Sequence, residues 1–76
     1  MKEKILEILK DIHPEIDFEN TTEKFSSDGL LDSFDVVQVI SDLEDSFDIS
    51  ISALDLIPEN FDSIDAIENL VKKCKK

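Results

Sequence analysis

The chain has 76 residues, of which 41% are hydrophobic and 36% are charged, and its formal net charge at pH 7 is −11. This length allows one small domain, residues 1–76, with a thin core and no room for a catalytic cleft. The strong negative charge excludes nucleic acid as a natural partner, because phosphates would be repelled, and it favours partners with basic surfaces.

The first segment predicts a helix over residues 2–12. Apolar side chains recur there at i, i+3, i+4 and i+7, on one helix face: Ile5, Ile8, Leu9 and Ile12. His13-Pro14 should end this helix, because the residue before a proline is pushed away from the α region. We expect His13 to be exposed near the negative end of the helix. A metal-binding or catalytic role for it is disfavoured, since no second histidine or cysteine stands near it in the sequence.

Residues 14–31 form a connection that is longer than most. Its apolar residues are expected to be buried: Ile16, Phe18, Phe25, Leu30 and Leu31. Residues 20–23 and 26–29 supply turn-forming side chains. We therefore expect this segment to lie over the bundle, with one helical turn, and to deliver the chain through Asp28-Gly29 to the next helix.

The longest helical pattern covers residues 33–47. Its apolar residues gather on one core-facing side: Val36, Val39, Ile40, Leu43 and Phe47. Asp32 is expected to be the N-cap, and Asp35 places a second carboxylate in the first turn, where the helix dipole favours negative charge. Ser33 should then lie at the start of the helix with its hydroxyl toward solvent, a position that tolerates an attached anion such as phosphate.

Phe34 and Val37 are predicted to lie off the core face of this helix. Polar and acidic residues surround them: Ser41, Gln38, Asp42, Glu44 and Asp45. An apolar spot rimmed by carboxylates is typical of a small transient docking surface. The alternative is that Phe34 folds back over the preceding loop.

The sequence Asp-Ser-apolar-Asp occurs three times, starting at Asp32, Asp45 and Asp62. By itself it indicates only a helix cap. The copy at Asp45 falls at the far end of a predicted helix, and the copy at Asp62 opens the last helix. Only the copy at Asp32 follows a Gly-Leu-Leu turn and precedes a long apolar stripe, which singles out Ser33.

The rest of the chain predicts three shorter pieces. Residues 48–51 should form an extended link with Ile51 turned inward, and residues 52–57 a short third helix capped by Ser52 and stopped by Pro58. A last helix over 63–73 has the apolar residues Ile64, Ile67, Leu70, Val71 and Cys74. The predicted fold is all-α: a small four-helix bundle of three longer helices plus one short helix III. Cys74 is the only cysteine, so no internal disulfide can form and a reducing compartment fits.

The charges are unevenly distributed. All eight lysines lie within residues 1–24 or 72–76, and residues 25–71 contain twelve acids and no lysine or arginine. A solvated surface kept for solubility would explain this pattern, but a single sign of charge around Ser33 favours a docking face.

Two stretches, Gly-Leu-Leu-Asp-Ser-Phe-Asp-Val-Val at 29–37 and Leu-Glu-Asp-Ser-Phe-Asp-Ile-Ser-Ile at 43–51, resemble acyl carrier proteins. The resemblance extends over the whole chain in length, acidity and helix order. It implies that Ser33 carries 4'-phosphopantetheine, whose thiol holds acyl or aminoacyl groups as thioesters and takes them between partner enzymes. Phe34 stands where the family most often has leucine, a change also found in aminoacyl and D-alanyl carriers. The cargo therefore stays open among fatty-acid, polyketide, aminoacyl and D-alanyl groups.

The same resemblance implies a phosphopantetheinyl transferase and acyl- or aminoacyl-loading enzymes with basic docking surfaces as partners. The expected docking residues, beside the flanking cap Asp32, are Phe34, Asp35, Val37, Ser41, Asp42, Glu44 and Asp45. We expect a cytoplasmic monomer, since no signal peptide or membrane span is visible.

Two other functional classes, an adaptor and an enzyme, are the alternatives to a carrier. A non-catalytic acidic helical adaptor would have the same fold and docking face but no prosthetic group. An enzyme is disfavoured because the chain has no evident nucleophile–base pair, and a metal site is disfavoured because it has no calcium-binding loop.

Overall fold

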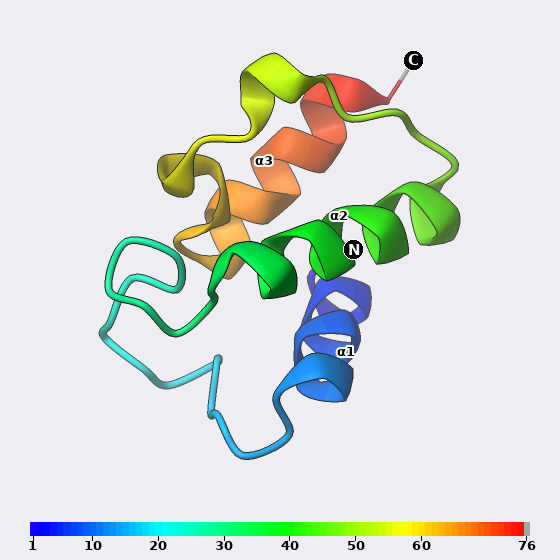
Figure 1. Ribbon diagram of the computed structural model, residues 1–76. Helices are drawn as coiled ribbons and strands as arrows, with labels where there is room; N and C mark the ends of the chain where they lie inside the picture. Colours follow the sequence, from blue (N-terminus) through cyan, green and yellow to red (C-terminus); the bar gives the residue numbers. More distant parts are fainter. Residues whose placement is uncertain (76) are drawn as a thin grey trace.

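The computed structural model describes residues 1–75 and contains three α-helices and two 3-10 turns, with no strand among these residues. In chain order they are α1 (Lys2–Ile12), α2 (Ser33–Phe47), η1 (Ala53–Asp55), η2 (Pro58–Phe61) and α3 (Ile64–Cys74) (Figure 1). The all-α class and the three longer helices are confirmed, and the bounds of α1 and α2 agree with the prediction. The last helix begins one residue later than expected, because Ser63 is its N-cap.

The predicted short third helix is wrong. Ser52 does act as a cap, with its hydroxyl accepting a hydrogen bond from the Leu54 N–H at 3.2 Å, but the turn lasts only from Ala53 to Asp55. Pro58, expected to stop a helix, instead opens η2. A short helix needs a buried face to offset its nucleation cost, and Leu54 is 88% exposed. The bundle therefore has three α-helices rather than four.

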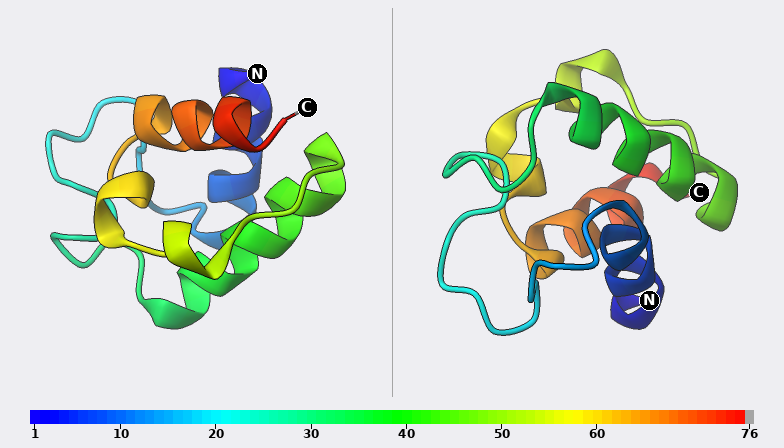
Figure 2. Two further views of the ribbon diagram at one scale, coloured as in Figure 1. Left: turned by 90° about the horizontal axis from the view of Figure 1, so that it is seen from above. Right: turned by 60° about the horizontal axis from the view of Figure 1, so that its bottom comes forward.

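The helices enclose a single apolar core. α1 packs against both α2 and α3, and η2 packs against α3. The long connection between α1 and α2 forms an open loop at one edge of the molecule, as all three views show (Figures 1 and 2). The buried side chains form one cluster: Ile5, Ile8, Leu9, Phe18, Phe25, Leu31, Val39, Leu43, Phe61, Ile67, Leu70 and Val71.

The connection contributes to this core as predicted. Phe18, Phe25 and Leu31 are buried, and Ile16 and Leu30 are half-buried. The rings of Phe18 and Phe25 lie 5.0 Å apart at 79°, an edge-to-face arrangement that aromatic pairs favour. The segment forms turns and bends, and two of its turns are single helical turns that no helix continues: the Thr21 N–H donates to the Asp17 carbonyl at 3.1 Å, and the Asp28 N–H to the Lys24 carbonyl at 3.0 Å.

Asp62, just before α3, ties this connection down. Its carboxylate accepts hydrogen bonds from the N–H groups of Ser26 and Ser27 at 3.1 and 2.8 Å, and from the Ser27 hydroxyl at 2.7 Å. The Asp62 carbonyl also accepts from the Phe25 N–H at 3.0 Å. Partial burial alone would raise the pKa of Asp62, but the bonds from Ser27 and Ser26 outweigh it and lower that pKa. The chain that leads into α2 is thus anchored to Asp62, which lies between η2 and α3.

Within residues 1–75, no helix is both long enough and apolar enough to cross a membrane.

Candidate functional site

Ser33 is the first residue of α2 and is exposed. The Asp32 side chain accepts a hydrogen bond from the Asp35 N–H at 2.9 Å, and the Asp35 side chain accepts one from the Asp32 N–H at 3.2 Å. These reciprocal bonds form a capping box around Ser33. The predicted N-cap is confirmed, and the Ser33 hydroxyl has no hydrogen-bond partner among residues 1–75.

The preceding turn positions this helix start. Gly29 has φ +88°, a left-handed conformation that a side chain would strain. Its N–H donates to the Ser26 carbonyl at 3.2 Å, and the Leu31 N–H donates to the Phe25 carbonyl at 2.7 Å. Leu31 is buried, so the turn is fixed to the core one residue before the cap.

Two large apolar side chains lie in solvent beside Ser33. Phe34 is 86% exposed and Val37 is 64% exposed, so the alternative in which Phe34 folds back over the loop is wrong. A hollow of about 540 Å³ lies next to them, and Ser33, Val37, Leu56 and Ile57 are among the residues that line it. The apolar surface therefore continues from α2 onto the segment between η1 and η2, which the sequence did not predict.

The three Asp-Ser-apolar-Asp segments differ in structure. At the third copy the N-cap is Ser63, whose hydroxyl accepts from the Ala66 N–H at 3.0 Å, while Asp62 holds the loop. At the second copy Ser46 is exposed near the end of α2, and Asp48 is the C-cap with φ +53°. Only Ser33 is both exposed and at the positive end of a helix.

The predicted acidic docking residues occupy different environments. Asp45 and Ser41 are exposed, and Asp42 is half-buried with its carboxylate accepting from Gln38 Nε2 at 3.1 Å. Glu44 is also half-buried, and its carboxylate accepts from the Ile51 N–H at 2.9 Å. Glu44, a predicted docking residue, thus also holds the link after α2.

Asp35 is directed toward His13 rather than freely into solvent. His13 Nε2 lies 2.6 Å from Asp35 Oδ2, and Nδ1 lies 2.8 Å from Glu15 Oε1. The side chains of His13 and Asp35 are 27% and 18% exposed, so the expectation of a freely exposed His13 is wrong. The hydrogen bonds to Asp35 and Glu15 raise the pKa of His13 above its ordinary 6.5. Partial burial alone would raise the pKa of Asp35, but the bonds from His13 and the Asp32 N–H outweigh it and lower that pKa.

Lysines from both ends of the chain neutralise part of the acidic span. Lys2 pairs with Asp65 at 2.7 Å, Lys73 with Asp55 at 2.8 Å and Lys72 with Glu68 at 3.6 Å. Among residues 1–75, no lysine forms an ion pair with a carboxylate of α2. The field around Ser33 therefore keeps a single sign apart from His13.

Comparisons with protein-family models, curated proteins and solved structures found no match for this chain. Its function must be argued from its own residues and geometry.

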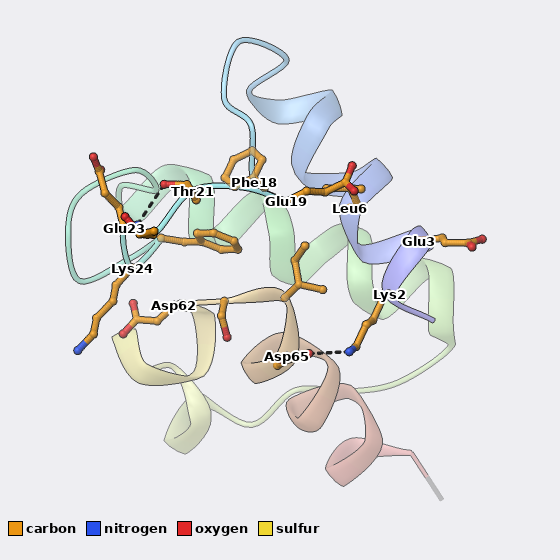
Figure 3. Close-up of a pocket in the computed structure, with 14 residues that line it drawn as sticks. Lys2, Glu3, Leu6, Phe18, Glu19, Thr21, Glu23, Lys24, Asp62 and Asp65 are labelled. Carbon is orange, nitrogen blue, oxygen red and sulfur yellow. Dashed lines mark hydrogen bonds and ion pairs between the residues drawn. The ribbon is translucent and has the colours of Figure 1, made fainter.

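A separate hollow lies between α1, the loop and the start of α3 and has a volume of about 550 Å³. Figure 3 shows Lys2 reaching across to Asp65, while Lys24 points away from the hollow. It shares no lining residue with the hollow beside Ser33. Residues 1–75 contain no group of three His, Cys, Asp or Glu side chains placed to hold a metal ion, and Cys74 is a half-buried free thiol.

Proposed function

We propose that this protein is an acyl carrier, with Ser33 as the point at which 4'-phosphopantetheine is attached. The observation that carries the proposal is the environment of Ser33. Its hydroxyl is exposed at the N-terminal end of a 15-residue helix, with exposed Phe34 and Val37 beside it. The resemblance of residues 29–37 and 43–51 to acyl carrier proteins supplies the chemical identity of the group.

The residues around Ser33 fit such a group. An attached phosphodiester would lie at the positive end of the α2 dipole, which favours an anion. The nearby carboxylates of Asp32 and Asp35 oppose this, but Asp35 already pairs with His13, which offsets part of its charge. The hollow beside Ser33 offers apolar surface for the arm.

Loading would form a bond between the Ser33 hydroxyl oxygen and a phosphorus of coenzyme A. The pyrophosphate bond of coenzyme A breaks, the nucleotide leaves as 3',5'-ADP, and the serine proton passes to a base on the transferase. Once attached, the group supplies a thiol that holds the cargo as a thioester. The role of this chain is to present an unobstructed serine on a rigid helix end.

Docking is proposed to combine an apolar centre with an acidic rim. Phe34 and Val37 would enter a pocket on the partner, and Asp42 and Asp45 would face basic side chains around it. Buried aromatic anchors contribute most of the affinity in such contacts, whereas rim charges mainly set association rate and specificity. The proposed partners are the phosphopantetheinyl transferase and acyl- or aminoacyl-loading enzymes. The proposed form of the protein is a monomer in the cytoplasm.

Intact-mass measurement tests the proposal. The chain is incubated with a broad-specificity phosphopantetheinyl transferase, coenzyme A and magnesium, and should gain the mass of one phosphopantetheine group. Ser33→Ala should abolish the gain. Ser46→Ala is the matched control, because Ser46 is also exposed on α2 in the same four-residue sequence but caps nothing. A gain that survives Ser33→Ala would overturn the assignment.

A non-catalytic acidic adaptor is the second candidate. It is favoured by the extent of exposed apolar surface, which includes Leu54, Leu56 and Ile57 as well as the α2 residues. An adaptor would show no mass gain, and its partner binding would be unaffected by Ser33→Ala but weakened by Phe34→Ala.

A further inference from the structure

His13 joins two helix ends through hydrogen bonds. Its ring lies at the C-cap of α1, and its backbone N–H donates to the Leu9 carbonyl at 2.9 Å. Its Nε2 contacts Asp35 Oδ2, the same oxygen that accepts from the Asp32 N–H in the capping box. A continuous chain of bonds therefore runs from the end of α1 to the residue that precedes Ser33.

Both ring nitrogens of His13 face carboxylates, and an ionised carboxylate can only accept hydrogen bonds. Each nitrogen must therefore carry a proton, so the geometry is that of an imidazolium. The two helix dipoles add to this pairing, since a cation is favoured at the C-terminal end of α1 and an anion at the N-terminal end of α2. The contact joins two residues that are 22 positions apart in the sequence.

We propose that His13 is a positioning residue for the Ser33 site, holding the first turn of α2 in the geometry that a transferase must grip. The expected effect on loading rests on the proposed carrier function. The coupling between His13 and the start of α2 does not depend on that function. His13 does not touch Ser33 in this chain of bonds, so it acts only through Asp35 and Asp32. Loss of the positive charge should loosen the capping box and slow loading without removing the serine.

The coupling should depend on pH. The groups that face His13 are Glu15 from the connection and Asp35 from α2. Because the pKa of His13 is raised, its contribution is complete below the ordinary value of 6.5 and is lost as the pH rises through the raised pKa. Because the pKa of Asp35 is lowered, its contribution is complete above the ordinary 3.8 and is lost as the pH falls through the lowered pKa. The coupling is therefore strongest between pH 3.8 and 6.5 and fades as the pH rises through the raised pKa of His13.

Nuclear magnetic resonance of the full chain tests the coupling without any enzyme. The Ser33 amide shift should follow the same titration midpoint as the His13 ring. In Asp35→Asn the His13 midpoint should fall toward its ordinary value, and the Ser33 amide should stop responding. Glu15→Gln is the matched control: it removes the other carboxylate partner, but the Ser33 amide should still follow His13. A Ser33 amide that ignores the His13 titration in the wild-type chain would overturn the proposal.

Loading rates test the consequence. At about pH 6, where the imidazolium dominates, His13→Gln should be loaded roughly two- to fivefold more slowly than the wild type, the effect of one partly exposed ion pair. The two rates should converge as the pH rises, whereas His13→Lys, which keeps its charge, should remain at the wild-type low-pH rate. Equal rates for wild type and His13→Gln at low pH would overturn the positioning role. Failure of every chain to load would instead reject the carrier function, while the resonance measurement would still decide the coupling.

Discussion

At the scale of single residues, the aspartates and serines of the three repeated segments have different tasks. Asp32 caps α2 and leaves Ser33 free, whereas Ser63 caps α3 and leaves Asp62 to hold the loop. The difference of one residue in where the helix begins decides which side chain faces solvent. An exposed serine hydroxyl at a helix start is therefore a property of the local cap, and the tetrapeptide alone does not specify it.

Removing the cap should weaken the domain. Asp32→Ala eliminates the bond to the Asp35 N–H, and loss of an N-cap costs about 0.5–2 kcal/mol of the free energy of unfolding. Asp45→Ala is the control, because Asp45 is exposed and caps nothing, so its effect should stay within about 0.5 kcal/mol. Denaturant titration followed by circular dichroism measures both. Equal stability of Asp32→Ala and wild type would show that the cap contributes nothing.

Truncation of Phe34 should reduce loading, whereas truncation of Phe61 should reduce the free energy of unfolding. Phe34 is exposed, so Phe34→Ala should leave the free energy of unfolding within about 0.5 kcal/mol but reduce loading of Ser33 at every salt concentration. Phe61 is completely buried, and Phe61→Ala should cost about 3–5 kcal/mol. Thermal unfolding and loading rates measured side by side check this. Strong destabilisation by Phe34→Ala with normal loading would reject the docking model.

At the scale of elements, the two ends of α2 are built differently. The N-terminal end is closed by the capping box, while the C-terminal end stops at Asp48 in a left-handed conformation with φ +53°. The Asp48 N–H returns to the Glu44 carbonyl, and the Glu44 carboxylate accepts from the Ile51 N–H. Glu44 of α2 thus fixes the direction of the link that leads to η1. The two residues directly after η1, Leu56 and Ile57, line the hollow beside Ser33.

Replacing the left-handed residue should stabilise the protein. Asp48→Gly removes the steric cost of a side chain at positive φ, and the net gain should be about 0.5–1 kcal/mol after the extra entropy of the unfolded glycine is subtracted. Asp45→Gly makes the same chemical change inside α2 and should instead cost about 0.5–1 kcal/mol. Chemical denaturation of the two variants distinguishes these signs. Destabilisation by Asp48→Gly would mean that its side chain contributes more than its backbone conformation costs.

At the scale of the whole molecule, the fold sorts the charges. Lysines of α1 and α3 pair with Asp65, Glu68 and Asp55, but the carboxylates of α2 keep no lysine partner within the described chain. The carboxylates of α2, the element that bears Ser33, therefore produce a negative field that no lysine ion pair within the described chain offsets. Such a field steers a basic partner, and salt screens it over a Debye length of about 10 Å at 0.1 M.

Charge reversal on this face should slow loading mainly at low salt. Asp42→Lys combined with Asp45→Lys removes the rim charges while leaving the core residues Val39 and Leu43 untouched. Glu3→Lys with Glu7→Lys changes the net charge equally on α1, away from Ser33, and should have a smaller effect. Loading rates measured from low to high salt compare the two pairs. An equal slowing by both would indicate dependence on net charge alone and not on a docking face.

The sequence by itself determined the features that depend on neighbouring residues. The apolar spacing in α1, α2 and α3 predicts each helix and its buried face, because helical periodicity is local. The cap at Asp32 and the exposure of Ser33, Phe34 and Val37 follow from the same register. Residues 52–57 do not form the helix that their sequence predicts, since a short apolar run forms a helix only if the tertiary structure gives it a face to bury.

Tertiary structure alone decided the contacts between distant segments. It placed Phe61 in the core, Asp62 on the loop, Leu56 and Ile57 beside Ser33, and His13 against Asp35. None of these pairings has a periodic signature, because each depends on how separate elements come together around the shared core. At the start of α2, Asp35 therefore receives a positive charge and a hydrogen bond from His13 at the end of α1. No local sequence pattern connects these two residues.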